Sequence, residues 1–81
     1  SFINFEGAAK FDVRTRTVIP DNHVVFYSDS DYKGFHISLT IGEYSADAIK
    51  LRSRTISSVK LPAGMNVLLY FQDILRAIIC F

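Results

Sequence analysis

The 81-residue chain contains a single cysteine and no tryptophan, and it has only two prolines and four glycines. With Cys80 alone, the chain forms no internal disulfide and offers no thiolate zinc cluster, and we expect Cys80 to be a small core residue. The glycines are dispersed, which excludes a glycine-rich loop that cradles phosphate. No apolar run approaches about 18 residues, so we predict no membrane span and expect no membrane partner.

Charge of either sign is also scarce. The chain has nine Lys and Arg residues and eight Asp and Glu residues, which gives a formal net charge of +1, and no block of like charge stands out. A nucleic-acid partner is therefore not expected. The alternating pairs Arg14 with Arg16 and Arg52 with Arg54 each fall on one face of a predicted strand, where we expect them to protect an exposed sheet edge.

Catalytic residue patterns are missing as well. His23 and His36 are the only histidines, and neither has a cysteine or a paired carboxylate at ligand or triad spacing. The carboxylates form no recognisable acid and base pair. We therefore expect the protein not to be an enzyme, and we expect His36 to be an outward-facing strand residue.

The composition that remains is that of a folded domain. Hydrophobic residues make up 49% of the chain and charged residues 21%, which separates it from disordered proteins. A chain of this length supports one small domain with one core.

The segment 24–39, VVFYSDSDYKGFHISL, predicts a β-hairpin. Residues 24–27 are β-branched or aromatic, and residues 35–39 alternate apolar and polar side chains at the strand period of two. Between them, residues 28–31 carry side chains that bond to nearby backbone, and Gly34 adopts a positive φ at low cost. An aromatic side chain can then fold over the hairpin at the glycine.

Other segments predict further strands. They are a short strand before Gly7, a half-buried strand at residues 11–17, a strand at residues 56–61 with Val59 and Leu61 inward, and a buried strand at residues 65–71. Within residues 11–17, the odd-numbered positions would share the buried face, and Asp12, Arg14 and Arg16 the exposed one. Turns are predicted at residues 20–22 and 62–64.

Two segments leave alternatives open. Residues 40–54 fit either a short strand or a single helical turn, and residues 71–81 have helical spacing. The spacing from Tyr70 through Leu75 to Ala77 nevertheless repeats that of the central hairpin, so we favour a strand. An alanine at the glycine position implies a strained or differently shaped hairpin.

The central segment resembles the Greek key of the βγ-crystallins. The matching residues are the aromatic and glycine positions of the hairpin, followed by a glycine, a tyrosine and two serines at the expected intervals: Tyr27, Tyr32, Gly34, Gly42, Tyr44, Ser57 and Ser58. The resemblance implies an all-β fold, a two-sheet Greek-key β-sandwich of about eight strands that the keys share.

The same resemblance implies one domain built from parts of two keys. Residues 23–62 form a complete key, residues 1–22 look like the second half of another key, and residues 63–81 look like a first half. The 1–81 chain therefore resembles a circularly permuted domain or a window cut across tandem repeats. In the second case, exposed edge strands would drive formation of a homodimer.

Many βγ-crystallins bind calcium, which prefers six to eight oxygen ligands. At residues 53–58 the acidic half of the family motif is missing and Arg54 repels a cation, so that site looks disabled. Residues 11–16 keep an acid in the second place and a hydroxyl in the fifth, although Arg16 in the sixth place weakens the match. The family pattern then implies a weak calcium site whose ligands are Asp12, the Val13 carbonyl, Thr15, Ser28 and Asp29.

An alternative explains these residues without a metal. Asp12 would form an ion pair with Arg16 on an exposed strand face, and residues 28–31 would only cap a loop.

The function implied by the resemblance is that of a structural or binding module with weak, single-site or lost calcium binding. The alternative is a protein-interaction module, an inhibitor-type or toxin-type relative of the same sandwich, that acts through loops or a dimerising edge strand. The sequence does not reveal the cellular compartment.

Overall fold

A computed structural model describes residues 3–49, 56–71 and 75–81, with the backbone alone at Phe71. These residues form an all-β sandwich, as predicted, with nine short strands where about eight were expected. The elements are β1 (Asn4–Glu6), β2 (Phe11–Asp12), β3 (Thr17–Val18), β4 (Val24–Asp29), the 3-10 turn η1 (Ser30–Tyr32), β5 (Lys33–Leu39), β6 (Gly42–Ser45), α1 (Ala46–Ile49), β7 (Ser58–Lys60), β8 (Asn66–Phe71) and β9 (Leu75–Cys80). In the described part of the chain, no helix is long and apolar enough to cross a membrane.

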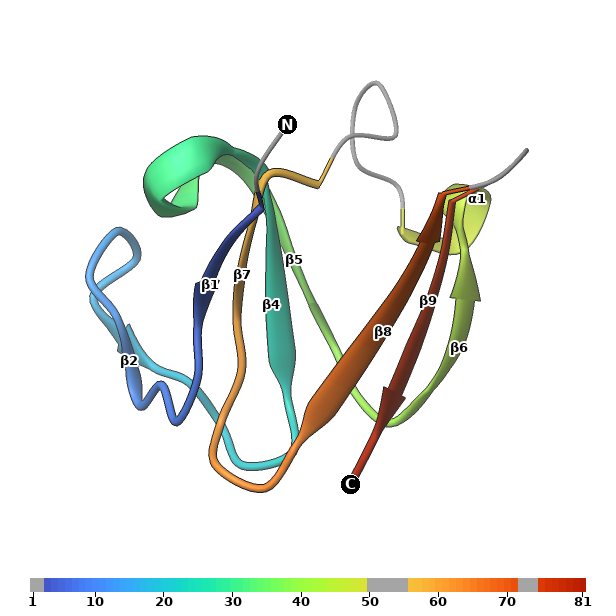
Figure 1. Cartoon of the computed structure of the whole chain (residues 1–81). Coiled ribbons are helices and arrows are strands. Elements are labelled where there is room, and N and C mark those ends of the chain that lie inside the picture. Colours follow the sequence, from blue (N-terminus) through green and yellow to red (C-terminus); the bar gives the residue numbers. More distant parts are fainter. Residues whose placement is uncertain (1–2, 50–55, 72–74) are drawn as a thin grey trace.

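The described residues form three sheets (Figure 1). A four-stranded sheet has the order β1-β7-β4-β5, a three-stranded sheet has the order β6-β9-β8, and β2 pairs with β3 in a small separate hairpin. β1 runs parallel to β7, so the opening segment joins the sheet of the central hairpin. β6 pairs with β9, so the closing segment joins the last strand before α1. The two larger sheets thus each combine strands from distant parts of the chain.

The main core lies between the two larger sheets. Its buried side chains come from β4, α1, β7, β9 and the segments beside them: Val24, Phe26, Ala46, Ile49, Ile56, Val59, Leu61, Met65, Leu75, Ala77 and Ile79. Val59 and Leu61 point inward, as predicted. A second, smaller cluster of Ala9, Ile19, Val25 and Tyr27 covers the opposite face of β4. Because β4 is covered on both faces, it is the central layer of the fold.

The folded hairpin predicted around Gly34 is confirmed. Gly34 has φ +80°, and a Cβ placed there would lie 2.3 Å from Ser28 Oγ and 2.6 Å from Asp29 Cγ. Tyr32 folds back so that its ring meets the Tyr27 ring edge-on, with 5.7 Å between the centroids. The glycine is therefore required for its backbone conformation and for its lack of a side chain.

The predicted strand at residues 11–17 is wrong. The chain instead makes two-residue strands on either side of a turn at residues 13–16, with Arg16 at φ +56°. Asp12, predicted to be exposed, is buried, and Phe11 and Val13, predicted to be buried, are exposed, whereas Arg14 and Arg16 are exposed as predicted. Arg14 and Arg16 consequently lie in a turn instead of guarding a strand edge, and Arg52 and Arg54 fall outside the described residues.

The closing segment is a strand, as favoured, over residues 75–80; residues 72–74 lie outside the described part. Ala77 is fully buried and is not among the described residues with positive φ, so it is unstrained. The prediction that residues 65–71 are buried is wrong, because β8 is an edge strand with Leu68 and Tyr70 about half exposed. Of the segment 40–54, the structure describes residues 40–49, and there both alternatives occur in turn, since β6 runs directly into the helical turn α1.

We predict that Gly34→Val lowers the free energy of unfolding by about 2 kcal/mol or more, because it combines a positive φ with a steric clash. Gly64 provides a matched control, since it has φ +84° and no atom lies within 4 Å of the position that a Cβ would occupy. Chemical denaturation of both valine variants should show a distinctly smaller loss for Gly64→Val. Equal losses would contradict the close packing of Gly34 against Ser28 and Asp29.

Candidate functional site

The candidate metal ligand Asp12 is buried at the junction of the β2–β3 hairpin and β4. Its Oδ2 atom accepts a hydrogen bond of 2.6 Å from the Tyr27 hydroxyl. Its Oδ1 atom accepts hydrogen bonds from the backbone N–H groups of Arg14 at 3.0 Å and Thr15 at 3.4 Å. The carboxylate therefore fixes the shape of the turn and ties the turn to the four-stranded sheet.

The surroundings of Asp12 favour its ionised form. Burial by itself raises the pKa of the carboxyl, but the Tyr27 hydroxyl, the Thr15 and Arg14 N–H groups and the positive charge of Lys60 outweigh burial and hold the pKa below its usual 3.8. Burial and the hydrogen bond to Asp12 raise the pKa of Tyr27, so its hydroxyl keeps the donated proton. The pair is thus a neutral donor and a charged acceptor at neutral pH.

Lys60 brings a buried positive charge to the same region. Its Nζ atom lies 3.6 Å from Glu6 Oε2, donates a hydrogen bond of 3.3 Å to the Phe11 carbonyl, and sits 4.9 Å from the centroid of the Tyr32 ring. A buried ammonium group is stable only with such partners. Lys60 therefore joins β1, β2 and the folded hairpin at one point.

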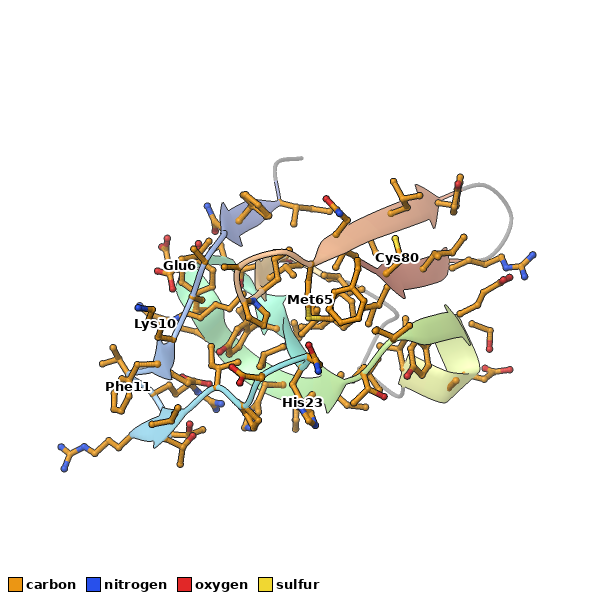
Figure 2. The ribbon with its side chains drawn as sticks, turned by 90° about the horizontal axis from the view of Figure 1, so that it is seen from below. Glu6, Lys10, Phe11, His23, Met65 and Cys80 are labelled. Atoms are coloured by element: carbon orange, nitrogen blue, oxygen red, sulfur yellow. The ribbon has the colours of Figure 1, made fainter. Side chains whose placement is uncertain are left out.

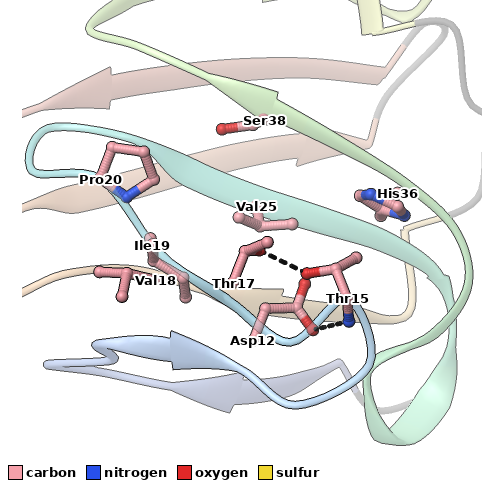
Figure 3. Close-up of a pocket in the computed structure, with 9 residues that line it drawn as sticks. All are labelled: Asp12, Thr15, Thr17, Val18, Ile19, Pro20, Val25, His36 and Ser38. Carbon is pink, nitrogen blue, oxygen red and sulfur yellow. Dashed lines mark hydrogen bonds between the residues drawn. The ribbon is translucent and has the colours of Figure 1, made fainter.

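An open groove of about 460 Å³ lies between the β2–β3 hairpin and the outer face of β4 and β5 (Figure 3). Asp12 and His36 lie on its lining, together with Thr15 and Thr17, whose hydroxyl oxygens are 2.6 Å apart. His36 is exposed, as predicted, and its Nδ1 atom lies 2.8 Å from Arg14 Nη1. The groove thus mixes hydroxyl, carboxylate and imidazole groups with an apolar floor.

The other candidate ligands have different roles in the structure. Ser28 Oγ accepts a hydrogen bond from the Phe35 N–H at 2.8 Å and donates one to Asp29 Oδ1 at 3.3 Å, so its bonds stay within its own hairpin. Val13 is 73% exposed at the turn. Across residues 3–49, 56–71 and 75–81, no three His, Cys, Asp or Glu side chains are grouped to hold a metal ion.

The metal-free alternative, an exposed ion pair between Asp12 and Arg16, is wrong. Asp12 is 4% exposed, and its oxygens meet Tyr27 and backbone N–H groups. The alternation of residues 11–17 gave no sign of this, because it does not reveal which face a second layer covers.

In the other calcium-type motif, residues 53–58, Ser58 is fully buried and its hydroxyl makes hydrogen bonds within the fold. Its Oγ atom donates a hydrogen bond of 2.6 Å to the Asp29 carbonyl and accepts one of 3.0 Å from the Tyr32 N–H. Ser53, Arg54 and Thr55 lie outside the described residues. Ser58 thus holds the folded hairpin closed.

Sequence reasoning missed Tyr27, Lys60 and Glu6 as partners of this site. A partial signal was present, because Val59 faces the main core and its neighbour Lys60 must then face the other side of β7. The contact between Tyr27 and Asp12 joins residues 15 positions apart, and no local pattern encodes it.

Comparison with known proteins finds a similar protein in Myxococcus xanthus. The chain is 40% identical over 55 residues to a protein named development-specific protein S homolog, and the aligned region covers 64% of this chain and 31% of that protein. The chain thus matches about a third of the length of this curated relative. No family model matches the chain, and no solved structure matches it.

We predict that Tyr27→Phe destabilises the protein by about 2 kcal/mol, because it leaves Asp12 Oδ2 buried without its donor.

The lowered pKa of Asp12 makes the stability of the protein depend on pH. Since the folded pKa is depressed, the stabilisation is present above the unfolded pKa near 3.8 and is lost as pH falls through the folded value.

Denaturation midpoints measured from pH 7 down to about pH 2 test this dependence. Asp12→Asn should reduce the loss of stability between pH 7 and about pH 2. Asp47→Asn, which changes an exposed acid on α1, should leave that loss the same as in wild type. An equal loss of stability at low pH in Asp12→Asn and wild type would contradict the role of Asp12 in this pH dependence.

Proposed function

We propose that the chain is a βγ-crystallin-like structural module without enzymatic activity, in which calcium affinity is weak because Asp12 is committed to the fold. Three findings support the family: the all-β sandwich, the folded hairpin at Gly34, and the similarity to the protein S homolog. The single observation that carries the structural role is the pair of Asp12 oxygens, which already accept three hydrogen bonds.

Calcium competes poorly for such a carboxylate. A hard divalent cation needs several oxygen ligands, and affinity falls as fewer carboxylates contribute. At Asp12, the ion would have to displace the Tyr27 hydroxyl or the turn N–H groups, and it would meet the positive charge of Lys60. We therefore place calcium binding by Asp12, Val13, Thr15, Ser28 and Asp29 in the millimolar range.

A calcium titration followed by calorimetry and thermal melts tests this proposal. With a Kd near 1 mM, about 1 mM calcium adds only about 0.4 kcal/mol of stability relative to chelator. Asp12→Ala should abolish even this response, while Asp47→Ala should retain it. Micromolar binding, or binding that survives Asp12→Ala, would contradict the proposal.

Tyr27→Phe gives a sharper version of the same test. Removing the hydroxyl frees Asp12 Oδ2, so the variant should be less stable than wild type in chelator and yet gain more stability from calcium. A calcium response equal to that of wild type would show that the hydrogen bond does not limit affinity.

A second candidate function is self-association through β8. This strand forms one edge of its sheet, contains no charged residue, and leaves Leu68 and Tyr70 50% and 46% exposed. The opposite edge strand of that sheet, β6, carries Glu43 in an exposed ion pair with Arg76. An uncharged edge with apolar side chains favours strand pairing with a second copy.

We predict that sedimentation velocity over about 10 μM to 1 mM detects a concentration-dependent homodimer of the wild type. Leu68→Lys should shift the protein to monomer, because it places a charge on the pairing edge. Ile41→Lys adds the same charge at an exposed position outside the strands and should leave the dimer intact. A monomer at all concentrations would rule out this second function.

A further inference from the structure

The β2–β3 hairpin presents apolar side chains on its outer face. Phe11 pairs with Val18 and Asp12 with Thr17, and directly opposed residues of two antiparallel strands share a face. Asp12 points toward β4, while Phe11 and Val18 are 44% and 70% exposed, and Val18 also lines the groove of Figure 3. Val13 follows in the turn. The hairpin lies beyond the four-stranded sheet, on the side away from β8 and β9 (Figure 1).

Positive charges accompany this apolar face. Lys10, Arg14 and Arg16 are all exposed, and they lie directly before the hairpin or in its turn. Lys10 and Phe11 lie together at one end of the molecule (Figure 2). The acid of the hairpin itself, Asp12, is buried beneath the turn. Outside the hairpin, Asp21 lines a hollow with Lys10 and Val18, and the Arg14 guanidinium lies 2.8 Å from His36 Nδ1. Cations and apolar groups therefore predominate on the hairpin surface.

The hairpin is also held firmly in place. The Ala9 N–H donates a hydrogen bond to the Leu61 carbonyl at 2.9 Å, and the Ile19 N–H donates one to the Lys10 carbonyl at 3.0 Å. Asp12 fixes the turn between them and anchors it to Tyr27. A partner that meets this surface therefore orders little of the chain on binding.

We propose that the β2–β3 hairpin is a docking site for an anionic lipid bilayer. Val13, Val18 and Phe11 enter the interface between headgroups and acyl chains, while Lys10 and Arg16 contact lipid phosphates and Arg14, which lies against His36, adds positive charge beside them. The charge of the surface is complementary to an anionic leaflet, and apolar insertion with electrostatic attraction is the usual basis of reversible peripheral binding. A nucleic acid would satisfy the cations but would leave the three apolar side chains without a partner.

This proposal departs from the expectation that the chain has no membrane partner. That expectation came from the lack of a long apolar run, which is a requirement for spanning a bilayer. Docking on its surface requires only a few exposed apolar side chains beside cations.

Co-sedimentation with vesicles tests the proposal. Wild-type protein should bind vesicles of phosphatidylcholine with about 30% phosphatidylserine, bind pure phosphatidylcholine far less, and dissociate at about 0.5 M salt. Arg14→Gln with Arg16→Asn should weaken binding about tenfold or more, and asparagine tolerates the positive φ of position 16. Val13→Ser with Val18→Thr should also weaken it.

A matched double variant controls for net charge. Lys33→Gln with Arg76→Gln removes two exposed positive charges outside the hairpin and should keep binding within about twofold of wild type. The proposal is overturned if wild type ignores anionic vesicles, if this control loses as much binding as the hairpin variant, or if a DNA duplex binds with a dependence on the arginines and vesicles do not. Thermal melts of each variant establish that it is folded.

Fluorescence gives a second readout, because the chain contains no tryptophan. The indole emission of Val13→Trp should shift to the blue on addition of the anionic vesicles and should be quenched by lipids brominated in their acyl chains. Phe81→Trp replaces an exposed aromatic residue after β9, away from β2, and should show neither effect. Equal shifts at both positions, or none at position 13, would overturn the proposed orientation.

Discussion

The hydrogen bond from the Tyr27 hydroxyl to the buried carboxylate of Asp12 fixes how the opening segment covers the sandwich. Together with the hydrogen bond from the Ala9 N–H to the Leu61 carbonyl, it holds the opening segment against β4, where Ala9 and Ile19 pack on Val25 and Tyr27. A carboxylate in this position is costly unless its charge is compensated. Tyr27, two turn N–H groups and the nearby Lys60 provide that compensation, so an otherwise destabilising charge organises three segments of the chain.

This arrangement limits the chemistry available to Asp12. The same oxygens that shape the turn would have to serve as calcium ligands, and the nearby positive charge of Lys60 would repel a metal ion. Structural stability and metal affinity therefore compete for one side chain. The Asp12 carboxylate also determines the shape of the hairpin surface, because it accepts a hydrogen bond from the turn that carries Val13 and Arg14.

The parts of the fold that could be predicted are those with strong local signals. Gly34 lies near the start of β5, just after a turn of serine and aspartate residues, and residues 35–39 alternate clearly, so both the hairpin and its folding-over follow from the sequence. The burial of Asp12 could not be predicted in this way. The period of two shows that residues 11 and 12 face opposite sides, but tertiary packing decides which side is covered.

The prediction that β8 is buried failed for a similar physical reason. An uninterrupted apolar run is typical of a strand covered on both faces, yet β8 lies at a sheet edge with one face open. Only the position of a strand in its sheet distinguishes these cases, and position depends on contacts between distant segments. If β8 pairs with a second copy of the chain, the apolar run reflects burial in the dimer, which the single chain does not contain.

Ala77 shows why the two halves of the molecule are not equivalent. In the central hairpin, Gly34 allows the chain to fold back over itself, and Ser58 closes that fold through the Asp29 carbonyl. In the closing segment, Ala77 is an ordinary strand residue paired with both Tyr44 and Leu69, and a Cβ is accommodated in the main core. A Cβ at this position is thus compatible with a regular antiparallel ladder. The hydrogen bonds of Asp12 and Ser58 both join elements around the four-stranded sheet, which contains Gly34.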